Sequence, residues 1–369
     1  MTKQVCLSMI VRNEAEVLPT TLKAILPFID CYSIVDTGST DDTAAVIQRH
    51  LGHLPGVVTP QEWRDFSTAR NLSLEIARKL GDYVFICDAD DVVMATIDGG
   101  AFRDQLIADV HNVNFRQGTL LYHRPLLVKS SWPASFHGVV HEFLAVGPAA
   151  TTGATIDGLI LDYNGAGVSD RNKDLVAKFE RDVTLIQTAL LTCDDPALAS
   201  RYTFYLANSL LSANRHTEAM QAYGDRTRQE VGYPQEVYIS FLRMGHLSRQ
   251  QYSNPRMQIH MYMMAYQTDP TRAEAQRYIA EVARDQHWWH LAWLFINDGL
   301  QRPLDPIKLF VETEVYEWRL RYEQSIAAWY LGHFDVGRNT CEWLLQRDDL
   351  PADIHEVTKN NLKLYDGAK

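Results

Sequence analysis

The segment that most limits how this chain can fold is a short apolar run that ends in carboxylates. Tyr83–Ile86 and Cys87 are followed by Asp88, Asp90 and Asp91. Such a run predicts a strand buried on both faces, as in a parallel α/β sheet, where ligands bind at the carboxyl ends of the strands. Asp88 and Asp90 are two positions apart and share one face of the strand. Two adjacent carboxylates repel each other unless a cation lies between them, so the pair predicts a divalent ion that completes its oxygen shell with substrate phosphates.

Composition limits the classes of protein that this chain can belong to. Its 369 residues have room for two domains, and its net charge of −11 disfavours nucleic acid as a partner. The five cysteines are scattered without a CxxC pair, which predicts core thiols in a reduced compartment. The beginning of the chain predicts a strand, Val5–Val11, and not a signal peptide. No apolar run is long enough for a membrane span, so we expect a soluble, cytoplasmic protein.

The first half of the chain alternates between strand and helix patterns. After Val5–Val11 we expect helices at 15–26, 44–51 and 68–80 and a strand at 32–35. Ser39 or Thr40 is expected to cap the second helix, and Ser67 the third. Residues 113–115 and 120–128 predict a β-hairpin that covers one edge of the sheet. This alternation predicts a parallel sheet with right-handed crossovers.

The second half is helical and weakly repetitive. Small residues recur at Ala207, Gly245, Ala280 and Ala327, which favours tetratricopeptide-like helix pairs over an ordinary helical bundle. We place the domains at 1–165 and 196–369, with a linker and connecting helix at 166–195. A helical domain of this kind could also pair two copies into a homodimer.

Four motifs, in this order, resemble glycosyltransferase family 2. They are Leu7-Ser8-Met9-Ile10-Val11-Arg12-Asn13-Glu14, Val35-Asp36-Thr37-Gly38-Ser39-Thr40-Asp41, Trp63-Arg64-Asp65-Phe66-Ser67-Thr68-Ala69-Arg70-Asn71 and Asp88-Ala89-Asp90-Asp91. The overall organisation is similar to the lipopolysaccharide-core and peptide S-glycosyltransferases of that family. The resemblance implies a GT-A Rossmann-like nucleotide-sugar-binding domain followed by an all-α tetratricopeptide-like domain. It also implies an inverting, metal-dependent hexosyltransferase that uses Mn²⁺ or Mg²⁺.

The resemblance also implies roles for individual residues in binding the donor. The first turn would line the nucleoside pocket, Asp36 would contact the base or ribose, and Arg70 would lie near the nucleotide. Asp88 would face the ribose or bind the metal through water, whereas Asp90 of the DXD motif would bind the metal directly. The residues expected at the donor are Val11, Arg12, Asn13, Glu14, Asp36, Arg70, Asp88, Ala89, Asp90, Arg171 and Lys173.

An inverting transfer needs a base on the acceptor side of the sugar. The segment Phe136-His137-Gly138-Val139-Val140-His141-Glu142 is similar to a His-Glu motif of this branch of the family. Glu142 and Asp91 are the candidate bases, and we favour Glu142. His141 could be a metal ligand, a base or a donor to the diphosphate.

Other functions fit parts of the sequence. Asp36-Thr37-Gly38-Ser39 alone resembles an aspartic-protease loop, but that chemistry needs a second such aspartate and none is present. A nucleotidyltransferase would need a Gly- and Lys-bearing phosphate loop, which residues 9–16 lack. An inactive transferase-like scaffold that binds a protein partner through its helices is the main alternative. The donor nucleotide, which family resemblance suggests is UDP, and the acceptor, a protein, peptide or glycan, are left open.

Overall fold

The computed structural model describes residues 3–117, 120–163, 174–252, 254–306 and 308–367. It divides into two compact units, Met1–Thr192 and Cys193–Lys369. We describe each unit by itself.

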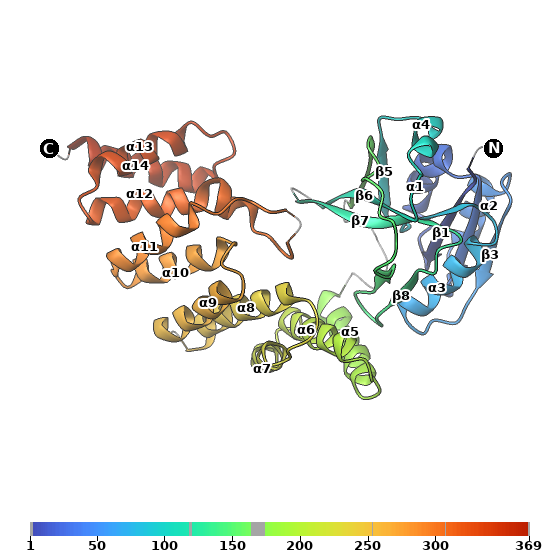
Figure 1. The fold of residues 1–369 in the computed structure, drawn as a ribbon, viewed down its shortest axis with the longest axis horizontal. Helices are drawn as coiled ribbons and strands as arrows, with labels where there is room; N and C mark the ends of the chain where they lie inside the picture. Colours follow the sequence, from blue (N-terminus) through green and yellow to red (C-terminus); the bar gives the residue numbers. More distant parts are fainter. Residues whose placement is uncertain (1–2, 118–119, 164–173, 253, 307, 368–369) are drawn as a thin grey trace. The chain divides into compact units, whose positions relative to one another are not determined.

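The first unit begins with the expected parallel sheet (Figure 1). Its strands are β1 (Val5–Val11), β2 (Cys31–Asp36), β3 (Gly56–Pro60) and β4 (Tyr83–Ile86), in the spatial order β3-β2-β1-β4. The connecting helices are α1 (Leu18–Ile25), α2 (Thr43–Leu51) and α3 (Phe66–Ala77). Both faces of β1 and β4 are buried, which explains why these strands are continuous apolar runs. Strands β2 and β4 lie on either side of β1 and run parallel to it. The carboxyl ends of the three strands therefore lie together, along the edge of the sheet that the strand ends form.

The second half of this sheet is mixed. The hairpin of β6 (Val110–Gln117) and β7 (Leu120–Lys129) forms as expected, with β7 antiparallel to β4. The prediction that this hairpin covers one edge of the sheet is wrong. Strand β10 (Leu159–Tyr163) pairs with β6, and β5 (Asp91–Ala95) pairs in turn with β10. These two short strands continue the sheet beyond the hairpin. The unit also contains α4 (Gly99–Asp104), a small pair of strands, β8 (Ser135–His137) and β9 (Phe143–Ala145), and α5 (Leu175–Leu190).

The helix caps differ from the sequence expectation. Asp65, and not Ser67, caps α3, because its carboxylate accepts the backbone N–H of Thr68 at 2.7 Å. At α2 the N-cap residue is Asp42, whose side chain makes no capping hydrogen bond, and the carboxylate of the preceding Asp41 accepts the N–H of Thr43 at 3.0 Å. An aspartate adds charge–dipole attraction to the hydrogen bond, which favours it over a nearby serine or threonine hydroxyl.

The second unit consists of helices that pack in consecutive pairs (Figure 1). The pairs are α6 (Pro196–Ser212) with α7 (His216–Thr227), α8 (Pro234–Tyr252) with α9 (Pro255–Thr268), α10 (Glu274–Asp285) with α11 (Trp289–Gly299), and α12 (Leu320–Tyr330) with α13 (Phe334–Leu345). A short helical turn, Val315–Arg319, leads into α12, and α14 (Ala352–Gly367) follows the last pair. The expected fold class, α/β followed by all-α helix pairs, is confirmed.

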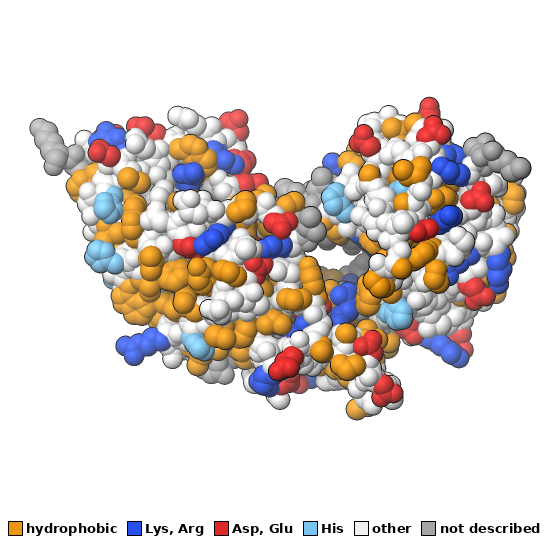
Figure 2. Space-filling model, in the orientation of Figure 1, with side chains coloured by type: hydrophobic (Ala, Val, Ile, Leu, Met, Phe, Trp, Pro, Cys, Tyr) orange, Lys and Arg blue, Asp and Glu red, His pale blue; other side chains and the backbone are white. Residues whose placement is uncertain are grey.

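Small residues allow close approach between these helices. Ala207, Ala280 and Ala327 are buried, and a Cβ atom at Gly245 would overlap the ring of Tyr262 on the neighbouring helix. Larger apolar side chains are exposed elsewhere on this unit, including Leu294, which is 62% exposed, and Figure 2 shows a gathering of such side chains over α9–α11. Among the described residues, no helix has the length and apolar character needed to cross a membrane.

Candidate functional site

The acidic loop lies between β4 and β5 and is fixed from inside the protein. The side chain of Asp91 is only 2% exposed, and its Oδ2 accepts the backbone N–H of Asp88 at 3.0 Å. From α1, the buried hydroxyl of Thr21 lies 2.8 Å from the carbonyl oxygens of both Ala89 and Asp91, which share its single proton. Asp91 and Thr21 therefore shape the loop, while Asp88 and Asp90 lie half-buried at its surface.

Arg70 joins two carboxylates that are far apart in the sequence. Its Nη2 lies 2.6 Å from Asp88 Oδ1, and its Nε lies 2.6 Å from Glu142 Oε1. The guanidinium also lies over the ring of Phe136, 5.5 Å from its centroid. Burial alone would lower the pKa of Arg70, but the two carboxylates raise it, so the guanidinium stays positively charged. Arg70, Asp88 and Glu142, which we call the Arg70 triad, connect the end of β4 to the His-Glu segment.

The remaining acidic groups carry a charge that the protein neutralises poorly. Burial, with repulsion from Asp88, raises the pKa of Asp90 and raises that of Asp91 to about 7. Burial, with repulsion from Asp90, Asp41 and Asp88, raises the pKa of Glu14 to about 7. Repulsion of this kind favours the arrival of a cation or of hydrogen-bond donors from a ligand.

The loops after β1 and β2 are hydrogen-bonded to each other. Asn13 adopts a left-handed backbone conformation with φ of 56°, and its side-chain oxygen accepts the N–H of Thr40 at 2.7 Å. In return, the Ser39 hydroxyl accepts the N–H of Asn13 at 3.0 Å. Asp36 Oδ1 accepts the N–H groups of Gly38 and Ser39 at 3.0 and 2.8 Å. Asp36 therefore shapes its own turn, and its other oxygen is the one that could contact a nucleoside.

Side chains of α3 position the His-Glu segment. The Asn71 side chain donates to the carbonyl of Phe136 at 2.9 Å and accepts its N–H at 2.7 Å. The Ser67 hydroxyl, expected to be a cap, instead donates to the carbonyl of Gly138 at 2.5 Å. His141 is exposed and has a φ of 52°, so the chain turns sharply just before Glu142.

The structure thus brings most of the expected site residues to one edge of the sheet. The side chains of Val11 and Ala89 are buried, 3% and 5% exposed, so only their backbone could face a ligand. Arg171 and Lys173 lie outside the described residues. Sequence reasoning missed Thr21 and Arg124, a β7 residue whose charge lowers the pKa of Asp88. The antiparallel hairpin was the signal that could have placed Arg124 next to β4.

The residues at this edge fit a metal only if a substrate completes its coordination. The described residues contain no group of three or more His, Cys, Asp or Glu side chains placed to bind an ion. Asp88 is ion-paired with Arg70, which leaves Asp90 as the carboxylate best placed to be a direct ligand. One or two carboxylates combined with substrate phosphates is a common way to bind Mg²⁺.

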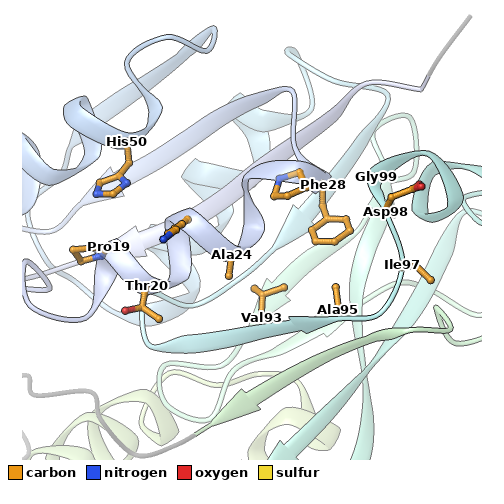
Figure 3. A pocket seen from close by; sticks show the side chains of 12 residues that line it. Pro19, Thr20, Ala24, Phe28, His50, Val93, Ala95, Ile97, Asp98 and Gly99 are labelled. Carbon is orange, nitrogen blue, oxygen red and sulfur yellow. The ribbon is translucent and has the colours of Figure 1, made fainter.

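A separate hollow of about 870 Å³ lies between α1 and β5 (Figure 3). Val93 and Ala95 of β5 face Ala24 and Phe28 there, and His50 lies at the rim. None of the residues that line it is one of the expected site residues. The candidate site is therefore the edge that holds the acidic loop, and not this hollow.

A family comparison decides what kind of domain carries this edge. Residues 6–96 match the model of glycosyl transferase family 2. This segment of the first unit is therefore similar to the glycosyl transferases of family 2. The match includes the loops after β1 and β2, Arg70 and the acidic loop.

Comparisons with individual proteins cover smaller shares or are more remote. A TPR repeat-containing protein of Synechococcus elongatus is 40% identical over 89 residues, which is 24% of this chain and 21% of that protein. The chain thus matches about a fifth of the length of this curated relative.

Two solved structures are similar at low identity. One is the structure of S. aureus TarS 1–349 in complex with UDP-GlcNAc, which is 13% identical to this chain. The similarity covers 77% of this chain and 92% of the TarS chain, with a TM-score of 0.37. A tetratricopeptide repeat protein from Parabacteroides merdae is 11% identical, covers 54% and 75%, and gives a TM-score of 0.40.

Proposed function

We propose that this protein is an inverting glycosyltransferase that moves a sugar from a nucleoside diphosphate donor to a protein, peptide or glycan acceptor. The observation that carries the proposal is the Arg70 triad at the end of β4. It joins the family's acidic loop to Glu142, so the donor-side and acceptor-side groups lie in one site. Family resemblance favours UDP as the nucleotide.

Glu142 is the better of the two candidate bases. A general base must reach the acceptor's proton, and Asp91 is 2% exposed with one oxygen already accepting the N–H of Asp88. Glu142 has one oxygen ion-paired with Arg70, which fixes its orientation and leaves Oε2 to accept the proton. Arg70 would then position the base and Asp88 together. His141, next to Glu142, is left as a donor to the diphosphate or a metal ligand.

The transfer itself is a displacement at the anomeric carbon. The acceptor atom bonds to that carbon while the bond to the diphosphate oxygen breaks, and the electron pair leaves with the diphosphate. The acceptor's proton passes to Glu142. A Mn²⁺ or Mg²⁺ ion bound by Asp90, with Asp88 nearby, would neutralise the charge on the leaving diphosphate.

The proposal is tested by incubating the protein with UDP-, GDP- and dTDP-sugars and identifying the products. Release of a nucleoside diphosphate from one donor supports a glycosyltransferase, because the bond between sugar and diphosphate is cleaved. Release of pyrophosphate from nucleoside triphosphates would instead identify a nucleotidyltransferase. Donor binding that never leads to turnover, even with candidate acceptors, would favour the inactive scaffold.

A further inference from the structure

Arg70 cannot supply much free positive charge to a diphosphate. Its Nη2 and Nε are each 2.6 Å from a carboxylate, and its side chain is 9% exposed. The triad of Arg70, Asp88 and Glu142 carries one positive and two negative charges. A donor diphosphate that enters this edge therefore meets net negative charge from the residues that sequence motifs identify.

Arg124 is a second cation at the same edge. Strand β7 is antiparallel to β4, with Tyr83 opposite Lys129 and Phe85 opposite Leu127. If the same register is continued past the paired residues, Arg124 lies opposite Asp88, just beyond the end of β4. The side chain of Arg124 is half-buried, and its guanidinium lies over the ring of Phe115 at 4.8 Å from the centroid.

The charge of Arg124 acts on the carboxylates of the acidic loop without an ion pair to them among the described residues. Burial opposes ionisation of Asp88, and Arg70 together with Arg124 lowers its pKa. Burial and repulsion from Asp88 raise the pKa values of Asp90 and Asp91, and the charge of Arg124 opposes this rise. Within the described part of the chain, Arg124 forms no ion pair with any carboxylate, unlike Arg70.

From this geometry we infer that Arg124 binds the donor diphosphate and stabilises it as the leaving group. The inference rests on the proposed function and adds a residue that the sequence motifs do not contain. A guanidinium offers several N–H donors in a plane, which suits two phosphate oxygens, and it stays protonated throughout. Arg124 donates hydrogen bonds to the diphosphate as its negative charge grows, while the acceptor's proton goes to Glu142.

The test compares binding of UDP and of uridine to four forms of the full chain. The forms are the wild type, Arg124→Met, Arg124→Lys and the control Arg116→Met. Arg116 lies on β6 of the same hairpin, but its charge is already paired with Asp162 at 2.6 Å. UDP is measured by calorimetry and uridine by ligand-detected NMR, both with Mg²⁺ present, because the proposed site binds the diphosphate with a divalent ion. GDP with guanosine, or dTDP with thymidine, replaces the uridine pair if the wild type prefers it.

We expect Arg124→Met to weaken binding of UDP by about 10-fold or more, since a hydrogen bond to a charged group is lost. Its affinity for uridine, which lacks phosphate, should not change. Arg124→Lys should recover part of the loss because the charge remains, and Arg116→Met should bind both ligands as the wild type does.

Two results would contradict the inference while leaving the proposed function intact. In the first, Arg124→Met binds UDP as tightly as the wild type. In the second, it loses UDP and uridine in equal proportion, which would show that Arg124 only supports the fold beside Phe115. A wild-type protein that binds none of the nucleoside diphosphates would instead overturn the proposed function itself.

Discussion

Arg70 determines the architecture of the site at the scale of single residues. It lies in α3 and pairs with Asp88 after β4 and with Glu142 beyond β8, so one guanidinium connects three separate segments. The family motif indicates that Arg70 lies near the nucleotide, but a motif does not show which carboxylates it contacts. Glu142 lies 72 positions from Arg70, and a contact over that separation depends on how the sheet folds.

Replacing Glu142 by glutamine tests the assignment of the base. Gln keeps an oxygen that can accept a hydrogen bond from Arg70, but it cannot take the acceptor's proton. We expect transfer to fall by roughly 10²–10⁴-fold while the affinity for donor stays within about twofold. The control is Glu16→Gln, since Glu16 is an exposed residue outside the site. Normal transfer by Glu142→Gln, measured with a known acceptor, would move the base to another group.

Helix α1 supports the acidic loop at the scale of elements. The Thr21 hydroxyl is the contact between this helix and the carbonyls of Ala89 and Asp91. The sequence predicted α1 and β4, because their apolar patterns are clear. It did not predict β5 or β10, because these two strands pair with each other across a long separation in the chain.

Thr21→Val removes the hydroxyl but keeps the shape of the side chain. We expect the free energy of unfolding to fall by about 1–3 kcal/mol, because two buried carbonyls lose a donor. Donor affinity should fall as well, since the acidic loop loses its support from α1. Thr20→Val is the matched control, because Thr20 is exposed on the same helix. Equal stability and equal donor affinity of the two variants would show that the Thr21 contact does not position the loop.

The whole molecule combines a site-bearing α/β unit with a helical unit that has buried charges of its own. Recurring small residues at irregular spacing predicted the helix pairs, and the structure confirms them. The buried ion pairs between helices were not predictable from that spacing. One of these pairs joins Glu323 of α12 to Arg284 of α10, with Oε1 2.5 Å from Nη1. The other oxygen of Glu323, Oε2, is buried without a hydrogen-bond partner among the described residues.

Glu323 makes the stability of the chain depend on pH. Burial, only partly offset by Arg284 and Arg277, raises its pKa from 4.5 to about 7. The folded state therefore binds a proton that the unfolded chain has released, so this stabilisation is present below pH 4.5 and is lost as pH rises through 7. In Glu323→Gln the free energy of unfolding should fall less steeply between these values, by at most about 1.4 kcal/mol per pH unit.

Urea unfolding at several pH values between 5 and 8 provides the measurement. Glu218→Gln is the control, because the hydrogen-bonded ion pair with Arg215 lowers the pKa of Glu218 and this carboxylate does not act on Glu323. That carboxylate stays ionised over the whole range, so its removal should change stability by a similar amount at each pH. If Glu323→Gln kept the wild-type pH slope, the buried proton would have to be elsewhere.

The central claim is that the acidic edge of the first unit cleaves a nucleotide sugar with the help of a divalent ion. The most direct test measures nucleoside diphosphate released by the wild type and by Asp90→Asn, each with Mn²⁺ and with EDTA. We predict release by the wild type with Mn²⁺, loss of that release with EDTA, and little release by Asp90→Asn under either condition. Equal release by both proteins, unaffected by EDTA, would contradict the claim.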